Sequence, residues 1–285
     1  MKIKNLIIMT AMLFATCSVM IGQKKSEISV YVGGGLSTLK YDLSVGDSKN
    51  KMGGTFGLGY TYFVTNNIGI VSGLELSLFN SKSTMDNISE QYMTKDDEGE
   101  EFRFSYTMKG YEEKQNLAYM SIPIMVQYQM SPEKGFYGAA GVKIGFPVKK
   151  KYKSSASSIT SSGYYPSSQV TYDDLEYRGF GTFNNIKHTN DLKVKTAYFL
   201  SVEAGYKIPI AENLRLYVGA YFDYGLNDIK KESNSNYFLP YDNANPTDFK
   251  SNSMLTGKYQ KGSESESFTD KVNLMAGGLK IRLAY

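Results

Sequence analysis

Residues that build metal centres, disulfides and histidine-based active sites are almost absent from this chain. Its 285 residues include one cysteine, one histidine and no tryptophan. One cysteine excludes a disulfide framework, and Cys17 and His188 together cannot form a Cys/His zinc cage or an iron–sulfur site. The sequence therefore predicts no cofactor and no metal site, and His188 is the one histidine on which catalysis could depend.

Strong charge of one sign is absent as well. The formal net charge is +4, and charged residues make up 21% of the chain. Lysine and arginine do not gather in clusters interleaved with aromatic residues, the pattern typical of nucleic-acid binding. We therefore expect no nucleic-acid partner.

A long apolar run is missing everywhere except near the N-terminus. Lys2 and Lys4 precede the almost wholly apolar stretch 6–21, which is shorter than the ~20 residues that a membrane-spanning helix needs. A basic start, a short apolar stretch and a small residue predict a secretory signal peptide of residues 1–22, with cleavage after Gly22. Residues 23–285 then form the exported domain.

Cys17 raises the alternative of a lipoprotein, in which a lipid is attached to a new N-terminal cysteine. A lipobox normally has Gly, Ala or Ser directly before the cysteine, and this chain has Thr16 there. We therefore expect Cys17 to be removed with the signal peptide. An exported domain without cysteine cannot use disulfides to stabilise its fold.

The rest of the chain alternates apolar with small or polar residues, which is the period of a β-strand. Eight runs show this pattern: 28–36, 52–62, 68–78, 118–130, 136–148, 198–208, 214–226 and 275–285. In every run, one set of alternate residues is free of charge. The opposite set carries the charged residues Glu75, Lys143, Glu203, Lys207, Arg215, Asp223, Lys280 and Arg282.

Alternation alone fits two arrangements. In a soluble barrel the apolar face packs inside and the charges meet water. In a membrane barrel the apolar face meets lipid and the charges point into the lumen.

Three features favour the membrane barrel. The first is a set of aromatic residues at one level of the apolar face, as in an interfacial girdle: Tyr60, Tyr62, Tyr128, Phe136, Tyr206 and Tyr285.

The second is that short turns at 63–67, 131–135 and 209–213 alternate with the long connections 37–51, 79–117, 149–197 and 227–274. Short turns on one side and long loops on the other are typical of outer-membrane barrels.

The third feature is the C-terminus. Leu279, Ile281 and Leu283 lead to a terminal aromatic residue, Tyr285. This spacing resembles the signal that the outer-membrane barrel assembly machinery reads. We expect that machinery and outer-membrane lipid to be partners of the chain.

Three stretches carry a family resemblance. Residues 117–128, with Tyr119 and the pair Ile122-Pro123, resemble the tyrosine–hydrophobic–x–Ile-Pro strand of the PorT-like small outer-membrane β-barrel family. Residues 141–145 and 205–209 are also similar to that family, and the whole chain resembles the OmpA and OmpX barrels more loosely. The resemblance implies an all-β, eight-stranded antiparallel transmembrane β-barrel in the cell outer membrane. These motifs mark the fold and imply no catalytic residues.

The predicted lumen leaves two interpretations open. An eight-stranded barrel encloses a space that side chains can fill, and unpaired buried charges are costly. A structural plug of ion pairs is favoured over a narrow pathway for small solutes or ions. Such a pathway would be lined by the basic residues Lys143, Lys207, Arg215, Lys280 and Arg282.

The long connections contain several further patterns. The acidic run 95–101 predicts a solvated loop, with calcium binding as the weaker alternative because EF-hand spacing is missing. Phe102, Phe104, Tyr106 and Met108 alternate, so we expect a hairpin that extends beyond the membrane. The serine-rich stretch 153–168 suggests a mobile loop. No G-x-S-x-G motif or spaced Ser/His pair accompanies His188, which we interpret as an ordinary loop histidine.

The sequence therefore predicts a non-enzymatic integral outer-membrane protein. The barrel is the membrane anchor, and the three long loops 79–117, 149–197 and 227–274 form a surface crown for binding or envelope structure. A surface or envelope protein is the expected partner of this crown. A narrow channel is the first alternative, and a soluble ligand-binding barrel of lipocalin type is the second.

Overall fold

The computed structural model describes residues 25–231, 233–261 and 264–285. The predicted signal peptide, residues 1–22, lies outside the described residues. Within the described ranges, no helix is long and apolar enough to cross a bilayer. The chain forms β1 (Ser26–Lys40), β2 (Asp47–Asn50), β3 (Met52–Phe63), β4 (Ile68–Lys95), β5 (Glu101–Gln129), β6 (Gly135–Tyr165), β7 (Val170–Tyr172), a 3-10 turn η2 (Glu176–Arg178), β8 (Gly181–Asp191), β9 (Ala197–Ala211), β10 (Leu214–Gly225), β11 (Lys258–Lys261), β12 (Glu264–Ser267) and β13 (Asn273–Ala284).

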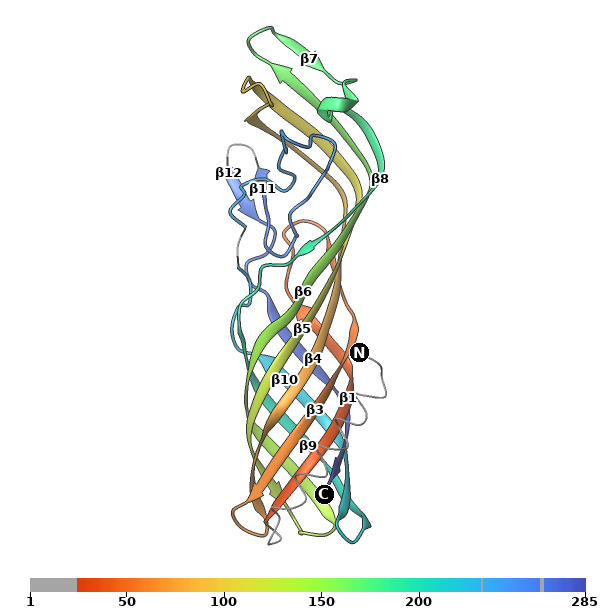
Figure 1. Ribbon diagram of the computed structural model, residues 1–285, viewed down its shortest axis with the longest axis vertical. Helices are drawn as coiled ribbons and strands as arrows, with labels where there is room; N and C mark the ends of the chain where they lie inside the picture. Colours follow the sequence, from red (N-terminus) through yellow and green to blue (C-terminus); the bar gives the residue numbers. More distant parts are fainter. Residues whose placement is uncertain (1–24, 232, 262–263) are drawn as a thin grey trace.

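Eight of these strands close into a ring of antiparallel neighbours. The order around the ring is β1, β3, β4, β5, β6, β9, β10 and β13, and β13 pairs again with β1. Ser29 lies opposite Ala284 and Lys40 lies opposite Asn273, so this closing pair runs the whole length of β13 (Figure 1). The predicted eight-stranded antiparallel barrel is confirmed.

The apolar set of alternate residues points out of the ring. Val32, Phe136 and Leu279 are 56%, 63% and 71% exposed. Ala118 is the exception and is buried, because a bulge shifts the register between Ala118 and Tyr119. An apolar outer face does not fit the soluble lipocalin-like alternative, in which apolar side chains pack inside.

Three strands continue far beyond the ring. β4, β5 and β6 contain 28, 29 and 31 residues and form, with β7 and β8, a sheet that rises above the barrel (Figure 1). We call this part the extension. Much of the connections 79–117 and 149–197 is therefore regular strand, and the predicted hairpin at 102–108 is confirmed. The mobile loop expected at 153–168 is wrong, because residues 153–165 belong to β6, pair with β5 and bury alternate side chains.

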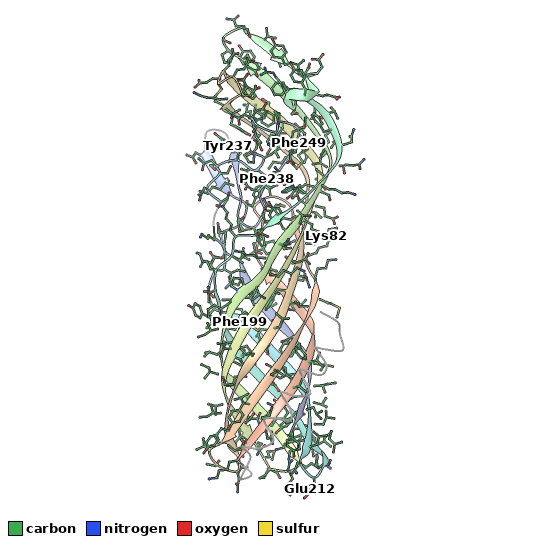
Figure 2. The ribbon with its side chains drawn as sticks, viewed as in Figure 1. Lys82, Phe199, Glu212, Tyr237, Phe238 and Phe249 are labelled. Atoms are coloured by element: carbon green, nitrogen blue, oxygen red, sulfur yellow. The ribbon has the colours of Figure 1, made fainter. Side chains whose placement is uncertain are left out.

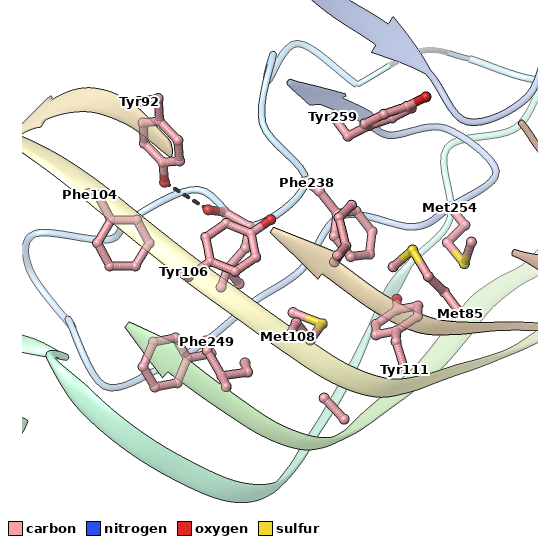
Figure 3. Packing of buried hydrophobic residues seen from close by; sticks show 14 of the residues in the cluster. Met85, Tyr92, Phe104, Tyr106, Met108, Tyr111, Phe238, Phe249, Met254 and Tyr259 are labelled. Atoms are coloured by element: carbon pink, nitrogen blue, oxygen red, sulfur yellow. Dashed lines mark hydrogen bonds between the residues drawn. The ribbon is translucent and has the colours of Figure 1, made fainter. Parts of the chain in front are cut away.

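The segment that follows β10 folds back onto the extension. It contains the small hairpin of β11 and β12, whose register pairs Lys258 with Ser267. Together these parts enclose an aromatic core that includes Tyr111 and Phe238, whose ring centres lie 5.1 Å apart (Figure 3). The ring of Phe238 also lies 4.9 Å from that of Phe268. The alternation of β5 continues into this core because Phe102, Tyr106 and other inward residues meet apolar partners there instead of water.

Candidate functional site

The lumen of the barrel contains a buried ion cluster. Lys143 of β6 lies between two carboxylates, with its Nζ 2.7 Å from Glu75 Oε1 and 2.9 Å from Asp223 Oδ2. Ser77 donates to the same Glu75 oxygen at 3.0 Å, and Ser201 donates to Asp223 Oδ1 at 2.5 Å. Inward-facing side chains of four strands thus meet in the lumen. Each of the two carboxylates contacts the Lys143 ammonium group and accepts a hydrogen bond from a serine hydroxyl.

A second group lies beside the first. Lys280 Nζ is 2.8 Å from Glu203 Oε2 and 3.9 Å from Glu75 Oε2, so it joins the two groups. Tyr31 donates to Glu75 at 3.0 Å, and Tyr137 donates to Glu203 at 2.8 Å. Every one of these oxygens therefore has a partner, which buried charges require.

A third group lies toward the short turns. Arg282 donates to Gln127 Oε1 at 2.7 Å, and its guanidinium lies 3.9 Å from the centre of the Tyr217 ring. Lys207 Nζ is 3.1 Å from Glu27 Oε1, and Tyr217 donates to the other Glu27 oxygen at 2.6 Å. These contacts extend the network of charges and hydrogen bonds to the end of the barrel where the short turns lie.

Seven of the eight charged residues predicted to point into the lumen are buried there. Glu75, Lys143, Glu203, Lys207, Asp223, Lys280 and Arg282 are all buried in the lumen. Arg215 is only half-buried, near the short turn after β9, and is therefore not one of the buried lumen charges. Glu27 was missed by the sequence reasoning, although it shares the inward phase of Ser29 and Tyr31 one residue before the predicted strand.

The lumen has little free space beside this network. The cavity bordered by Glu75, Lys143, Glu203 and Lys280 has a volume of about 20 Å³. A volume of this size holds about one water molecule.

An apolar layer lies above the charges, at the mouth of the barrel. The Phe79 ring stacks on Phe199 at 5.9 Å and meets Tyr119 edge-on at 6.0 Å. Leu39, Tyr152 and others complete this cluster, which we call the mouth plug. Figure 2 places Phe199 at the height of the upper barrel wall. The mouth plug was not predicted from the sequence. The signal for it is that the inward-facing residues change from charged to apolar toward these ends of the strands.

The residues of the predicted assembly signal lie on the outer face of the closing strand. Leu279, Ile281 and Tyr285 are at least half exposed, and Leu283 is exposed as well. Among the predicted girdle residues, the Phe136 and Tyr206 rings touch edge-on at 5.0 Å.

The extension carries an open pocket with a volume of about 570 Å³. Its lining is rich in hydroxyl and amide groups: Ser89, Glu90, Gln91, Ser105, Tyr106, Thr107, Thr160, Ser161, Ser162, Asp173 and Gln260. Pairing sets Ser89 opposite Thr107, and Thr107 opposite Thr160, so three strands contribute one row of hydroxyls. A pocket of this size can hold a small ligand, and this lining can recognise it through hydrogen bonds.

Two buried carboxylates hold the fold-back segment against the extension. Glu90 accepts hydrogen bonds from the backbone N–H groups of Phe238 at 3.0 Å and Gln260 at 2.6 Å, and from the Tyr106 hydroxyl. Glu113 accepts from the Ser253 hydroxyl at 2.5 Å and the Met254 N–H at 2.9 Å. Burial raises the pKa of both carboxyls above the ordinary value. The sequence reasoning missed both residues, although each lies in the inward phase of its strand.

The acidic run 95–101 forms the tip of the β4–β5 hairpin. Asp96 is buried and accepts hydrogen bonds from the N–H groups of Glu98 and Glu100, from Tyr165 and from Arg178 at 2.8 Å. Burial disfavours the charged carboxylate, but these hydrogen bonds outweigh burial and hold the pKa of Asp96 below its usual value. The calcium alternative gains no support, since the described residues contain no group of three or more potential metal ligands.

His188 is half-buried and lies in β8, so it is a strand residue rather than the expected loop residue. It pairs in register with Ser154 of β6. Burial lowers its pKa below the ordinary value of a histidine.

Comparison with solved structures finds other small outer-membrane proteins. Ail, the attachment invasion locus protein of Yersinia pestis, is 12% identical with a TM-score of 0.32, over 92% of this chain and 99% of that chain. OprG from Pseudomonas aeruginosa is 10% identical with a TM-score of 0.32, over 90% and 95%. Neisserial surface protein A is 8% identical with a TM-score of 0.35, over 91% and 97%. These likenesses are too weak to transfer a function.

No curated protein matches the chain. A family model described as outer membrane protein beta-barrel domain matches residues 21–231, which is most of the chain. This match agrees with the closed ring, the apolar outer face and the charged lumen. The chain belongs to the outer membrane protein β-barrel domain family and is located in the outer membrane.

Proposed function

We propose that this protein is a non-enzymatic membrane anchor that presents a rigid binding module at the cell surface. The extension is that module, and the single observation that supports this role most strongly is its own buried aromatic core. A segment that only shielded the membrane would not need eighteen buried apolar side chains arranged in one cluster or carboxylates that fix a returning loop. Short turns lie on the periplasmic side of outer-membrane barrels, so the extension faces outward.

The pocket of the extension gives this module its binding site. Hydroxyl and amide groups from three paired strands fix positions for several hydrogen bonds, and the rigid sheet keeps the loss of side-chain entropy small on binding. The ligand is a polar surface molecule or the polar face of an envelope protein. We also infer export by cleavage after Gly22 and a place in the PorT-like branch of the family, on the strength of the Ile122-Pro123 strand.

The narrow-channel alternative would need an open path past two obstacles. The ion cluster around Lys143 leaves a cavity of about 20 Å³, and the mouth plug closes the lumen above it. Both obstacles favour the anchor over the channel.

A binding experiment with the full-length protein tests the proposal. Ser105→Arg and Thr160→Arg place a long charged side chain into the pocket, and Thr171→Arg is the matched control because Thr171 is exposed on β7 and outside the pocket lining. Native complexes are captured from gently solubilised outer membranes, and single-channel conductance is recorded in parallel. We expect the two pocket variants to lose a partner that the wild type and the control retain. Unchanged capture by all variants, together with a single-channel conductance of the wild type, would favour the channel.

A further inference from the structure

A row of lysines crosses the foot of the extension. Strand pairing sets Lys49 of β2 opposite Lys82 of β4, Lys82 opposite Lys114 of β5, and Lys114 opposite Lys153 of β6. Paired residues on neighbouring strands share one face, and the strands are ~4.8 Å apart. Four ammonium groups therefore follow one another along a single row of the sheet, which we call the lysine row.

Like charges directly opposite each other destabilise a sheet. Glu112 relieves part of this repulsion, because its two oxygens lie 2.5 Å from Lys82 Nζ and 3.0 Å from Lys114 Nζ. One carboxylate between two lysines still leaves the row strongly positive. Lys149 on β6 is exposed and adds to the same surface, whereas the charge of Lys151 is offset by Asp191, which lies opposite it on β8. This excess of positive charge makes the surface attractive to an anionic partner from outside the chain.

The position of the lysine row indicates what that partner is. On β4, Leu78 is the last exposed apolar residue before Lys82, four residues earlier in the strand. On β6, exposed Val148 is followed directly by Lys149. Figure 2 shows Lys82 where the barrel passes into the extension, above Phe199. The row thus begins where the lipid-facing band ends, at the level of lipid headgroups.

The opposite rim of the barrel has no comparable row among the described residues. Its turns carry Glu133 beside Lys134 in one case and Glu212 in another, so acids and bases nearly balance there. Figure 2 places Glu212 at this lower end. The positive surface is therefore specific to the outer side of the membrane.

We propose that the lysine row binds phosphate groups on the headgroups of outer-leaflet lipids. An ammonium group is a compact charge that suits phosphate, and lysines near a charged bilayer surface contribute to binding in an additive way. The acyl chains of the same lipid lie along exposed apolar residues such as Leu78 and Val148, which a soluble polyanion could not use. The extension is thereby held at a fixed height and orientation above the bilayer.

The test uses the full-length protein in phosphatidylcholine nanodiscs that contain one-tenth lipid A. Lipid A has phosphate groups on a multi-chain lipid, and a dephosphorylated preparation of it provides the comparison lipid. The variant carries Lys82→Gln, Lys114→Gln and Lys153→Gln together. The control carries Lys25→Gln, Lys95→Gln and Lys134→Gln, three lysines away from the row. Mass spectrometry of the extracted complexes counts the bound lipid.

We expect the lysine-row variant to bind lipid A about one hundredfold more weakly, from the loss of three contributing charges. The control should retain as much as the wild type, and the dephosphorylated lipid should bind weakly to all three. A variant with Arg at the same three positions should keep the binding, and the gel-mobility shift of the folded barrel checks that every variant folds. Equal retention by the variant and the control, or equal binding of the dephosphorylated lipid, would overturn the proposal.

Discussion

Lys143→Met is the sharpest perturbation of the lumen, because Lys143 is 3% exposed and neutralises two buried carboxylates. Glu75 keeps Lys280 at 3.9 Å after this change, but Asp223 keeps only the hydroxyl of Ser201. Removing one partner of a buried ion pair costs about 3–5 kcal/mol, because the remaining charge stays desolvated without compensation. We expect a loss of that size in the free energy of unfolding, which is a factor of about one hundred to several thousand in the equilibrium.

The assay is urea unfolding of the protein in lipid vesicles. The chain has no tryptophan, so circular dichroism and the gel-mobility shift of the folded barrel serve as readouts. A second variant combines Lys143→Met with Asp223→Asn, which removes the stranded charge while keeping a polar partner for Ser201. This double variant should recover a large part of the loss. If Lys143→Met alone unfolds within about 0.5 kcal/mol of the wild type, the lumen charges are solvated and the description of a closed ion cluster fails.

Three further predictions concern the outer face, the hairpin tip and assembly. Leu76→Arg or Val218→Arg, near mid-strand on the outer face, should each cost about 2–4 kcal/mol in vesicles, and insertion equal to the wild type would show that these residues do not meet lipid. Asp96→Asn should speed amide exchange at the hairpin tip at neutral pH. The pKa of Asp96 is lowered, so its contribution is present above about pH 3.9 and is lost as the pH falls below that value. Wild-type exchange at the tip should therefore approach that of the variant in acid, and a constant difference would contradict this account. Tyr285→Ser should slow assembly and leave unfolded chain in the periplasm, whereas normal assembly would remove Tyr285 from the assembly signal.

The barrel wall was predictable because its physics is local. Lipid on one side and a filled lumen on the other force alternate residues such as Val142 and Lys143 into opposite chemistry, and this pattern is visible one strand at a time. The strand phases, the short turns and the closing position of the C-terminal strand followed from it. The missed Glu27 shows the limit of this approach at strand ends, where the outward residues no longer meet the hydrocarbon core.

The connections were harder to interpret because their partners are distant in the sequence. Serine-rich residues 153–165 have little apolar character of their own, and they are strand because β5 lies on one side of them and β8 on the other. Glu113 is buried because Ser253 and Met254, about 140 positions later, donate to it. No local pattern indicates such a contact.

The sequence by itself determined the family architecture: which residues face lipid, which charges point inward, and on which side the long connections lie. Tertiary structure alone decided how the charges pair, that an apolar layer closes the barrel mouth, and that the connections fold into one module with a pocket and a lysine row at its foot. The reason is the range of the interactions. Alternation reports the solvent on each side of a strand, whereas ion pairs, aromatic packing and strand register join residues whose proximity exists only after the ring has closed.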